Sequence, residues 1–283
     1  MLASVLFSCK DNDPTPDNPK DENPCLISQT AMSGGFQLNY LYDNKNRLLE
    51  VNSSFGGKQT FRHLSDTLVE EGNLNAAISS NRVSYLLMPN GNLKSIITEM
   101  WNPQFGFGLV QATISKQDYV YLPNGNFSEL ITYDANYFVD SATGRPLGNI
   151  RLKKNGKTIV SYNADNEMLS VSSYFIDNNG QEFLSSTENV TAYQTDETGN
   201  ANELSAYYLP MSGQNRNVAI GKPLYIGTKV PKVFETNGGF SNSKRTLTFG
   251  LNELKQVQTI EEEMDTDFGF PFTNTTNLQW ICP

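Results

Sequence analysis

Short runs of alternating apolar and polar residues recur along most of the chain. Phe36, Leu38 and Tyr40 alternate with polar residues, and the segments 83–85 and 171–175 show related patterns. A period of two places one side of a strand against a core and the other side in water. No stretch longer than about ten residues keeps the helical spacing of apolar positions. The pattern therefore predicts an all-β protein of antiparallel strands, each with one buried face.

Turn signals separate these runs. Asn-Gly dipeptides occur at 90–91, 124–125, 155–156 and 179–180, and the first two lie in near-identical Pro-Asn-Gly-Asn segments. Asn and Gly both tolerate the positive φ that a type I′ turn needs, so each dipeptide predicts a tight hairpin.

The hairpins repeat. Residues 40–48 match 85–93 and 119–127, with fainter copies at 161–168 and 247–254. Such repeats stack hairpins side by side, so that each buries the face its neighbour leaves open. We expect one antiparallel hairpin-repeat sheet over residues 25–283, closed or nearly closed into a soluble barrel.

Composition narrows the possible chemistry. The 283 residues carry a formal charge of −9, which argues against nucleic acid as a partner because that contact needs Lys and Arg. One histidine, His63, and three cysteines argue against a metal site and a Ser-His-Asp triad, and no cofactor is expected. Acidic residues over 261–267 lack EF-hand spacing and suit a solvated strand edge better than a calcium site. No carboxylate pair has a glycosidase context, so binding is favoured over catalysis.

The first 25 residues differ from the rest. A short apolar run ends in Leu6-Phe7-Ser8-Cys9, and residues 10–24 carry four prolines, five acidic residues and no apolar one. This resembles the lipobox of bacterial lipoproteins followed by the Asp-rich surface-export signal of Bacteroidetes. The resemblance implies a signal remnant at 1–8, acylation of Cys9, a disordered tether over 9–24, and display on the outer membrane. The alternative is an ordinary first strand with a buried cysteine.

The number of cysteines suggests how they pair. With Cys9 acylated, Cys25 and Cys282 remain, near the two ends of the folded domain. In an oxidising envelope, two remaining cysteines suggest a disulfide between them, which would make the first and last strands neighbours. Two unrelated buried thiols are the alternative.

The hairpins resemble the tyrosine–aspartate (Rhs-like) repeats of secreted bacterial proteins, with Tyr40, Tyr42 and Asp43 in the signature places. Together with the lipobox and the tether, they resemble a family of uncharacterised Bacteroidetes lipoproteins with a porin-like β-barrel. Polar residues such as Gln37, Asn39, Ser84 and Lys94 on the non-core faces favour a barrel in water over one in lipid.

Aromatic residues gather near two Gly-containing connections. These residues are Trp101, Phe105, Phe107, Phe268 and Phe270. We expect them to form a platform for a glycan or another apolar-faced ligand at a barrel mouth, although they could instead plug that end. Thr67 and Ser141 lie in segments resembling the short O-glycosylation motif of Bacteroidetes. The expected function is a surface lipoprotein that binds a ligand, and the alternative is a structural component of an envelope protein complex.

Overall fold

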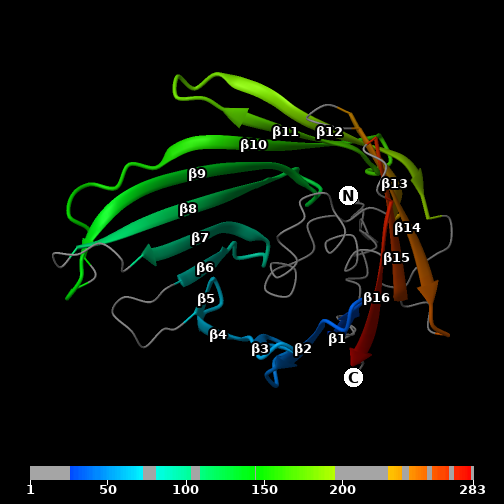
Figure 1. Ribbon diagram of the computed structural model, residues 1–283, viewed down its shortest axis with the longest axis horizontal. Helices are drawn as coiled ribbons and strands as arrows, with labels where there is room; N and C mark the ends of the chain where they lie inside the picture. The colour runs from blue at the N-terminus through cyan, green and yellow to red at the C-terminus, as the bar shows by residue number, and fades with distance from the viewer. Residues whose placement is uncertain are drawn as a thin grey trace, which may run out of the picture.

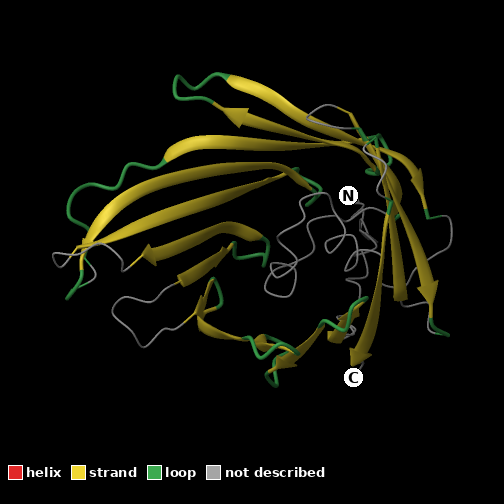
Figure 2. Cartoon of the chain, in the orientation of Figure 1, coloured by secondary structure: helices red, strands yellow, loops and turns green. Residues whose placement is uncertain are grey.

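The computed structural model describes residues 26–72, 81–102, 109–143, 145–194, 229–237, 242–253, 257–267 and 271–281. These residues form strands and turns and contain no helix, so no helix among them could cross a membrane (Figure 2). The strands are β1 (Leu26–Met32), β2 (Gln37–Tyr42), β3 (Leu48–Ser53), β4 (Lys58–Ser65), β5 (Leu68–Gly72), β6 (Asn81–Leu87), β7 (Leu93–Asn102), β8 (Leu109–Tyr121), β9 (Phe127–Asp140), β10 (Lys153–Tyr162), β11 (Met168–Ile176), β12 (Glu182–Tyr193), β13 (Pro231–Asn237), β14 (Ser243–Leu251), β15 (Val257–Thr266) and β16 (Phe272–Ile281).

The sixteen strands form one closed antiparallel barrel in which each strand pairs with its neighbours in sequence. The barrel closes where β1 meets β16, with Leu26 opposite Ile281, and Figure 1 shows these strands side by side at the two ends of the colour scale. The expected all-β fold, with hairpins closed into a barrel, is confirmed.

One face of every strand lines the interior of a closed barrel. Tyr40 lies opposite Val51, and Val69 opposite Tyr85, and all four side chains are buried. They belong to an apolar cluster with members from strands around the whole barrel, so the face they share is the inner one. Because side chains alternate, their sequence neighbours face outward.

The two ends of the barrel differ, and we name them separately. At the base lie the turns 43–47, 88–92, 122–126 and 163–167, the start of β1 and the end of β16. We call the opposite end the rim. Every connection from an odd-numbered strand to the next strand lies there, beginning with β1 to β2 and β3 to β4. The wall is uneven, because β8 and β9 have 13 and 14 residues whereas β2 and β3 have 6 each.

The base hairpins share one geometry. Gly91 and Gly125 have φ of 85° and 90°, and Asn46 and Asn166 occupy the corresponding place with φ of 59° and 62°. Each turn is flanked by the same register shift between its two strands, for instance between Leu41 and Tyr42 on β2 and between Val120 and Tyr121 on β8. The repeat seen in the sequence is therefore a repeated turn and bulge.

Two details of the predicted turns are wrong. Asn90 and Asn124 do not have positive φ, so these hairpins are not type I′ turns: a single left-handed residue followed by a bulge reverses the chain instead. Asn155 and Gly156 form no turn either, since they lie within β10, where the register with β9 shifts. Gly156 is there because a Cβ atom would come within 2.6 Å of Thr132 Oγ1.

Candidate functional site

The inner side of the base is apolar. Phe127, Phe234, Leu48, Leu93 and Met168 are among its fully buried side chains. All of them lie within a few residues of a base turn or of the base end of a strand. This cluster supplies the burial that holds the ring of strands together, at about 25 cal/mol for each Å² of apolar surface removed from water.

A series of side-chain hydrogen bonds surrounds this cluster. Tyr42 Oη donates to the Ile27 carbonyl over 2.9 Å, and Tyr121 Oη donates to the Leu93 carbonyl over 2.8 Å. Tyr162 bonds the Phe127 carbonyl in the same way over 2.5 Å. The series continues with Tyr193 to the Met168 carbonyl, Trp280 Nε1 to the Val257 carbonyl, and His63 Nε2 to the Leu48 carbonyl.

Each of these bonds occupies the same place in the fold. The donor stands near the end of a strand that runs toward the base, and the acceptor is at or near the start of the strand before it. On β7 and β8, for example, the backbone pairing stops at Ser95 and Asp118, and the Leu93 carbonyl lies beyond it. A buried carbonyl without a partner is costly, so the tyrosine hydroxyl completes the pairing that the backbone leaves open.

Phenylalanines line the rim. The exposed ones among the described residues are Phe55 (76%), Phe175 (54%), Phe272 (54%), Phe138 (46%) and Phe183 (39%), and all lie in rim turns or near the rim ends of strands. Phe61, Phe127, Phe234 and Phe249, by contrast, belong to the apolar cluster at the base.

Two pairs of rim phenylalanines are stacked. Phe175 and Phe183 have ring centroids 5.1 Å apart and planes 17° from parallel, and they join β11 to β12. Phe36 and Phe55, from two neighbouring rim turns, are 5.7 Å apart at 22°. Exposed rings in this arrangement offer flat apolar surface to a ligand at the rim.

Only Trp101 of the five predicted ligand-binding aromatics lies within the described residues. It belongs to β7, since the pairing with β8 runs on to Asn102 and Gln111, and it is 9% exposed. Trp101 packs on the outer face with Val110, Ala112 and Val139. Phe105, Phe107, Phe268 and Phe270 lie outside the described residues.

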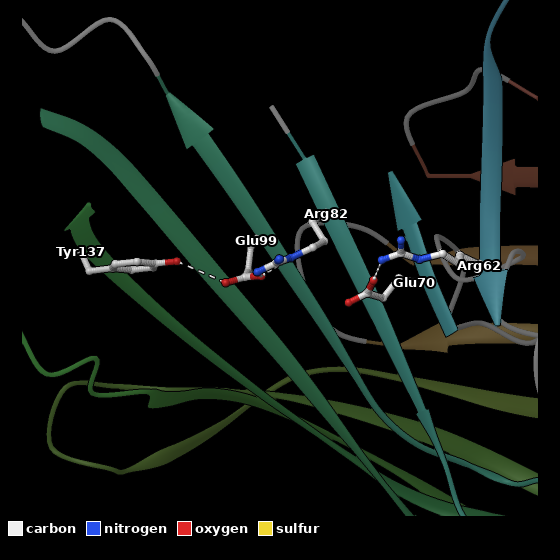
Figure 3. A network of polar contacts seen from close by, with 5 residues as sticks. All are labelled: Arg62, Glu70, Arg82, Glu99 and Tyr137. Atoms are coloured by element: carbon white, nitrogen blue, oxygen red, sulfur yellow. Dashed lines mark hydrogen bonds and ion pairs between the residues drawn. The ribbon is translucent and has the colours of Figure 1, made fainter. Parts of the chain in front are cut away.

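Polar side chains join on the outer wall beside Trp101. Arg82 bonds Glu99 through Nε, at 2.8 Å, and Nη2, and its guanidinium carbon lies 5.5 Å from the centre of the Trp101 ring. Tyr137 Oη reaches the same carboxylate at 3.5 Å, so β6, β7 and β9 are linked (Figure 3). Burial is the largest cause that raises the pKa of Tyr137, and the Glu99 carboxylate adds to it.

More ion pairs continue around the outer wall. Arg62 bonds Glu70 at 2.9 Å, one strand pair away from Arg82 (Figure 3). Lys116 bonds Asp118 at 2.7 Å on β8. On the lipid face of a membrane barrel, Arg or Lys would cost about 2–4 kcal/mol at the bilayer midplane and less near the interfaces.

Inside the barrel, Arg245 lies between two carboxylates. Its guanidinium is 3.8 Å from Glu188 and 3.6 Å from Glu262, and it stacks over Phe234 at 4.4 Å. Burial raises the pKa of Glu188, an effect that Arg245 opposes and Glu262 reinforces. This group joins β12, β13, β14 and β15 across the inner face.

The acidic run on β15 divides between the two faces of the strand. Glu262 lies opposite Leu247 on the inner face, whereas Glu261 and Glu263 face outward opposite threonines. The described residues hold no group of acidic, His or Cys side chains placed to share a metal ion. The run is also not an edge, since β15 is paired on both sides with β14 and β16.

A polar cleft lies at the rim between β13, β14 and β15. Its volume is 370 Å³, and its lining consists of Glu235, Thr236, Asn242, Ser243, Lys244, Asp265, Thr266 and Asp267. Asp267 accepts a hydrogen bond from the Asn242 backbone amide at 3.1 Å, so part of this lining joins the rim ends of β14 and β15.

The remaining predicted residues have these places. Cys9, Cys25 and Cys282, with the segments 1–8 and 9–24, lie outside the described residues. Thr67 is exposed in the turn between β4 and β5, and Ser141 is exposed after β9, so modification of both stays a prediction. His63 faces inward and belongs to the carbonyl-bonding series, a role that its position between Arg62 and Leu64 did not reveal.

Comparison with known proteins assigns the fold. No protein-family model matches the chain, and no curated protein matches it. A porin-like protein from Bacteroides vulgatus ATCC 8482 superposes with a TM-score of 0.59 at 12% identity, covering 91% of this chain and 99% of that one. A porin-like protein from Bacteroides uniformis ATCC 8492 superposes with a TM-score of 0.55 at 13% identity, with the same coverage. The chain thus has the same fold as porin-like barrel proteins of Bacteroides.

Proposed function

We propose that this protein is a binding module of the bacterial cell surface, anchored in the outer membrane through an acylated Cys9, with its barrel in water. The rim would take up a glycan or another ligand with apolar faces. The observation that carries the proposal is the placement of every exposed phenylalanine of the described chain at the rim, opposite the end where the chain enters. Sugar rings have apolar faces that stack on such aromatic surface.

The stacked pair Phe175 and Phe183 is the part of the rim best suited to this role. Both rings are more than a third exposed, and their stacking holds them nearly parallel to one another before a ligand arrives. A preformed surface loses less conformational entropy on binding than one that must be ordered first.

Binding to arrayed plant, host and bacterial polysaccharides tests this proposal. We expect the double variant Phe175→Ala/Phe183→Ala to bind its glycan at least about tenfold more weakly, since two exposed rings carry stacking energy of about 0.5–1.5 kcal/mol each. Leu169→Ala is the matched control, because Leu169 lies on the same strand β11, is 43% exposed, and stands near the base. Unchanged binding by the double variant, or no binding by the parent protein, would refute the rim as a ligand site.

A barrel that spans the membrane is the second candidate, and the likeness to porin-like proteins favours it. The ion pairs of the outer wall favour the barrel in water, because Arg62, Glu70, Arg82 and Glu99 would otherwise face lipid. The full chain with Cys9→Ser decides between them. We expect alkaline washing to release it into solution without detergent, whereas a spanning barrel would remain in the membrane fraction.

A further inference from the structure

Aliphatic residues form an arc around the outside of the base. On seven neighbouring strands, from β16 through β1 to β6, an outward residue near the base is leucine or isoleucine. We call this set the collar, and its members are Ile281, Leu26, Leu41, Leu49, Leu64, Leu68 and Leu86. Four of them are well exposed, at 56% for Ile281, 51% for Leu41, 47% for Leu64 and 39% for Leu49.

The collar is one residue deep. The next outward residue toward the rim is polar on each of these strands: Gln279, Gln29, Asn39, Glu50, Arg62, Glu70 and Ser84. Leu68 and Leu86 lie directly opposite one another, and so do the polar pair Glu70 and Ser84 above them. The boundary between apolar and polar surface therefore runs along the base from strand to strand, whereas isolated exposed leucines would show no such order.

We infer that the collar rests on the surface of a lipid bilayer. The inference rests on the proposed anchoring through Cys9, because the chain enters the barrel at Leu26, itself a member of the collar. Seventeen positions separate Cys9 from Leu26, a span of at most about 60 Å, so an acylated chain keeps this side of the base within reach of the membrane.

The composition of the collar also suits lipid better than protein. Its members are all aliphatic, whereas the residues that dominate protein–protein interfaces are Trp, Tyr and Arg. Such a row of leucines can enter the headgroup region while the polar wall above stays in water. In this orientation the rim, with its exposed phenylalanines, points away from the membrane.

Vesicle flotation tests the inference. The full chain with Cys9→Ser, which cannot be acylated, is mixed with phosphatidylcholine vesicles, whose lack of net charge excludes electrostatic attraction. We expect it to float with the vesicles, and Leu41→Asn/Leu49→Asn/Leu64→Asn to lose at least about tenfold in partitioning, because each exposed side chain contributes apolar surface. The control Leu147→Asn/Leu184→Asn changes two residues near the rim that are 55% and 59% exposed, and should leave partitioning within about twofold of the parent.

Three results would overturn the inference. These are no flotation of the parent, flotation of the collar variant equal to that of the parent, and a loss in the rim control as large as in the collar variant. If light scattering shows instead that the parent forms a dimer that the collar variant does not, the collar binds a second copy and not lipid. Matching thermal transitions by circular dichroism establish that the variants are folded.

The two tryptophans report the orientation. Trp280 is at the base beside Ile281, and Trp101 is near the rim on β7. With brominated phosphatidylcholine, we expect stronger quenching in the Trp101→Phe protein than in the Trp280→Phe protein. The Trp101→Phe protein keeps Trp280, whose ring faces the inner cluster but is next to the collar residue Ile281. Equal quenching in the two proteins, or the reverse pattern, would overturn the inference. The quenching measurement needs neither an acylated Cys9 nor a bound glycan. A negative result would therefore count against the collar alone and not against the proposed glycan binding.

Discussion

The hydroxyl of Tyr121 and the carbonyl oxygen of Leu93 are 2.8 Å apart, and they join β8 to β7 beyond the last backbone pair of those strands. Removal of the hydroxyl leaves a buried carbonyl unsatisfied. We expect Tyr121→Phe to lower the free energy of unfolding by about 1–3 kcal/mol, measured by denaturant titration.

The control for this change is Tyr133→Phe. Tyr133 faces outward on β9 near Lys116, whose ammonium lies 5.6 Å from its ring centre, and that contact does not involve the hydroxyl. We expect a change within about 0.5 kcal/mol. Equal losses at Tyr121 and Tyr133 would show that the carbonyl bonds do not stabilise the base.

Glu188 should make stability depend on pH in one direction. Burial raises its pKa in the folded state above the unfolded value, so the folded protein binds the proton more tightly. Its contribution is therefore complete below the unfolded pKa and is lost as the pH rises through the folded pKa. We expect Glu188→Gln, which keeps the neutral shape, to stabilise the protein more at pH 7 than at pH 4 in denaturant titrations. A greater gain at pH 4 would contradict this.

Asp43 should act in the opposite direction. Hydrogen bonds from Arg47, the side-chain bond first, lower the pKa of Asp43 from 3.8 to about 2. Its contribution is present above the unfolded pKa and is lost as the pH falls from about 4 toward 2. We expect Asp43→Asn to destabilise the protein at pH 6 and to have a smaller effect near pH 2. Thermal denaturation at both pH values measures the two effects. An effect that grows as the pH falls would show that the turn does not depend on the carboxylate.

The disulfide between Cys25 and Cys282 stays a prediction. Leu26 and Ile281 are paired across the seam, and Cys25 and Cys282 are their neighbours in the sequence, outside the described residues. We expect the mass of the intact protein to rise by two hydrogens on reduction, and Cys282→Ser to abolish that gain. Loss of the bond should lower stability by up to about 5 kcal/mol in the chain-entropy model. An unchanged mass on reduction would leave two free thiols.

Much of the barrel could be predicted because its signals are local. Alternation in segments such as 36–40 identified strands, and the repeat of residues 40–48 at 85–93 and 119–127 identified the hairpins at the base. Asn155-Gly156 misled because the same dipeptide serves a tight turn and a strand bulge, and only the neighbouring side chain of Thr132 distinguishes them. The number of strands could not be predicted, because it is set by the closure of the whole sheet and not by the sequence of any one hairpin.

The candidate site was less visible in the sequence. Phe175 and Phe183 lie on different strands, and only the register that places them opposite one another makes them a pair. The carbonyl-bonding series had a signal, because Tyr42, Tyr121 and Tyr162 hold equivalent places in the repeat. The collar could not be found without the closed sheet, since its members are spread over the first 86 residues and position 281.

The seam between β1 and β16 also governs the order in which the molecule can be made. Ser28 on the first strand bonds the carbonyl of Gln279 on the last, a partner 251 residues away. During synthesis the N-terminal strand emerges long before this partner, and pairing across such a separation forms slowly because a long loop must close first. Until the final strand arrives, the nascent sheet has two unpaired edges, and unpaired edges invite association with other chains. A chain truncated before β16 would keep both edges permanently, so β16 protects the protein from aggregation as well as completing the barrel.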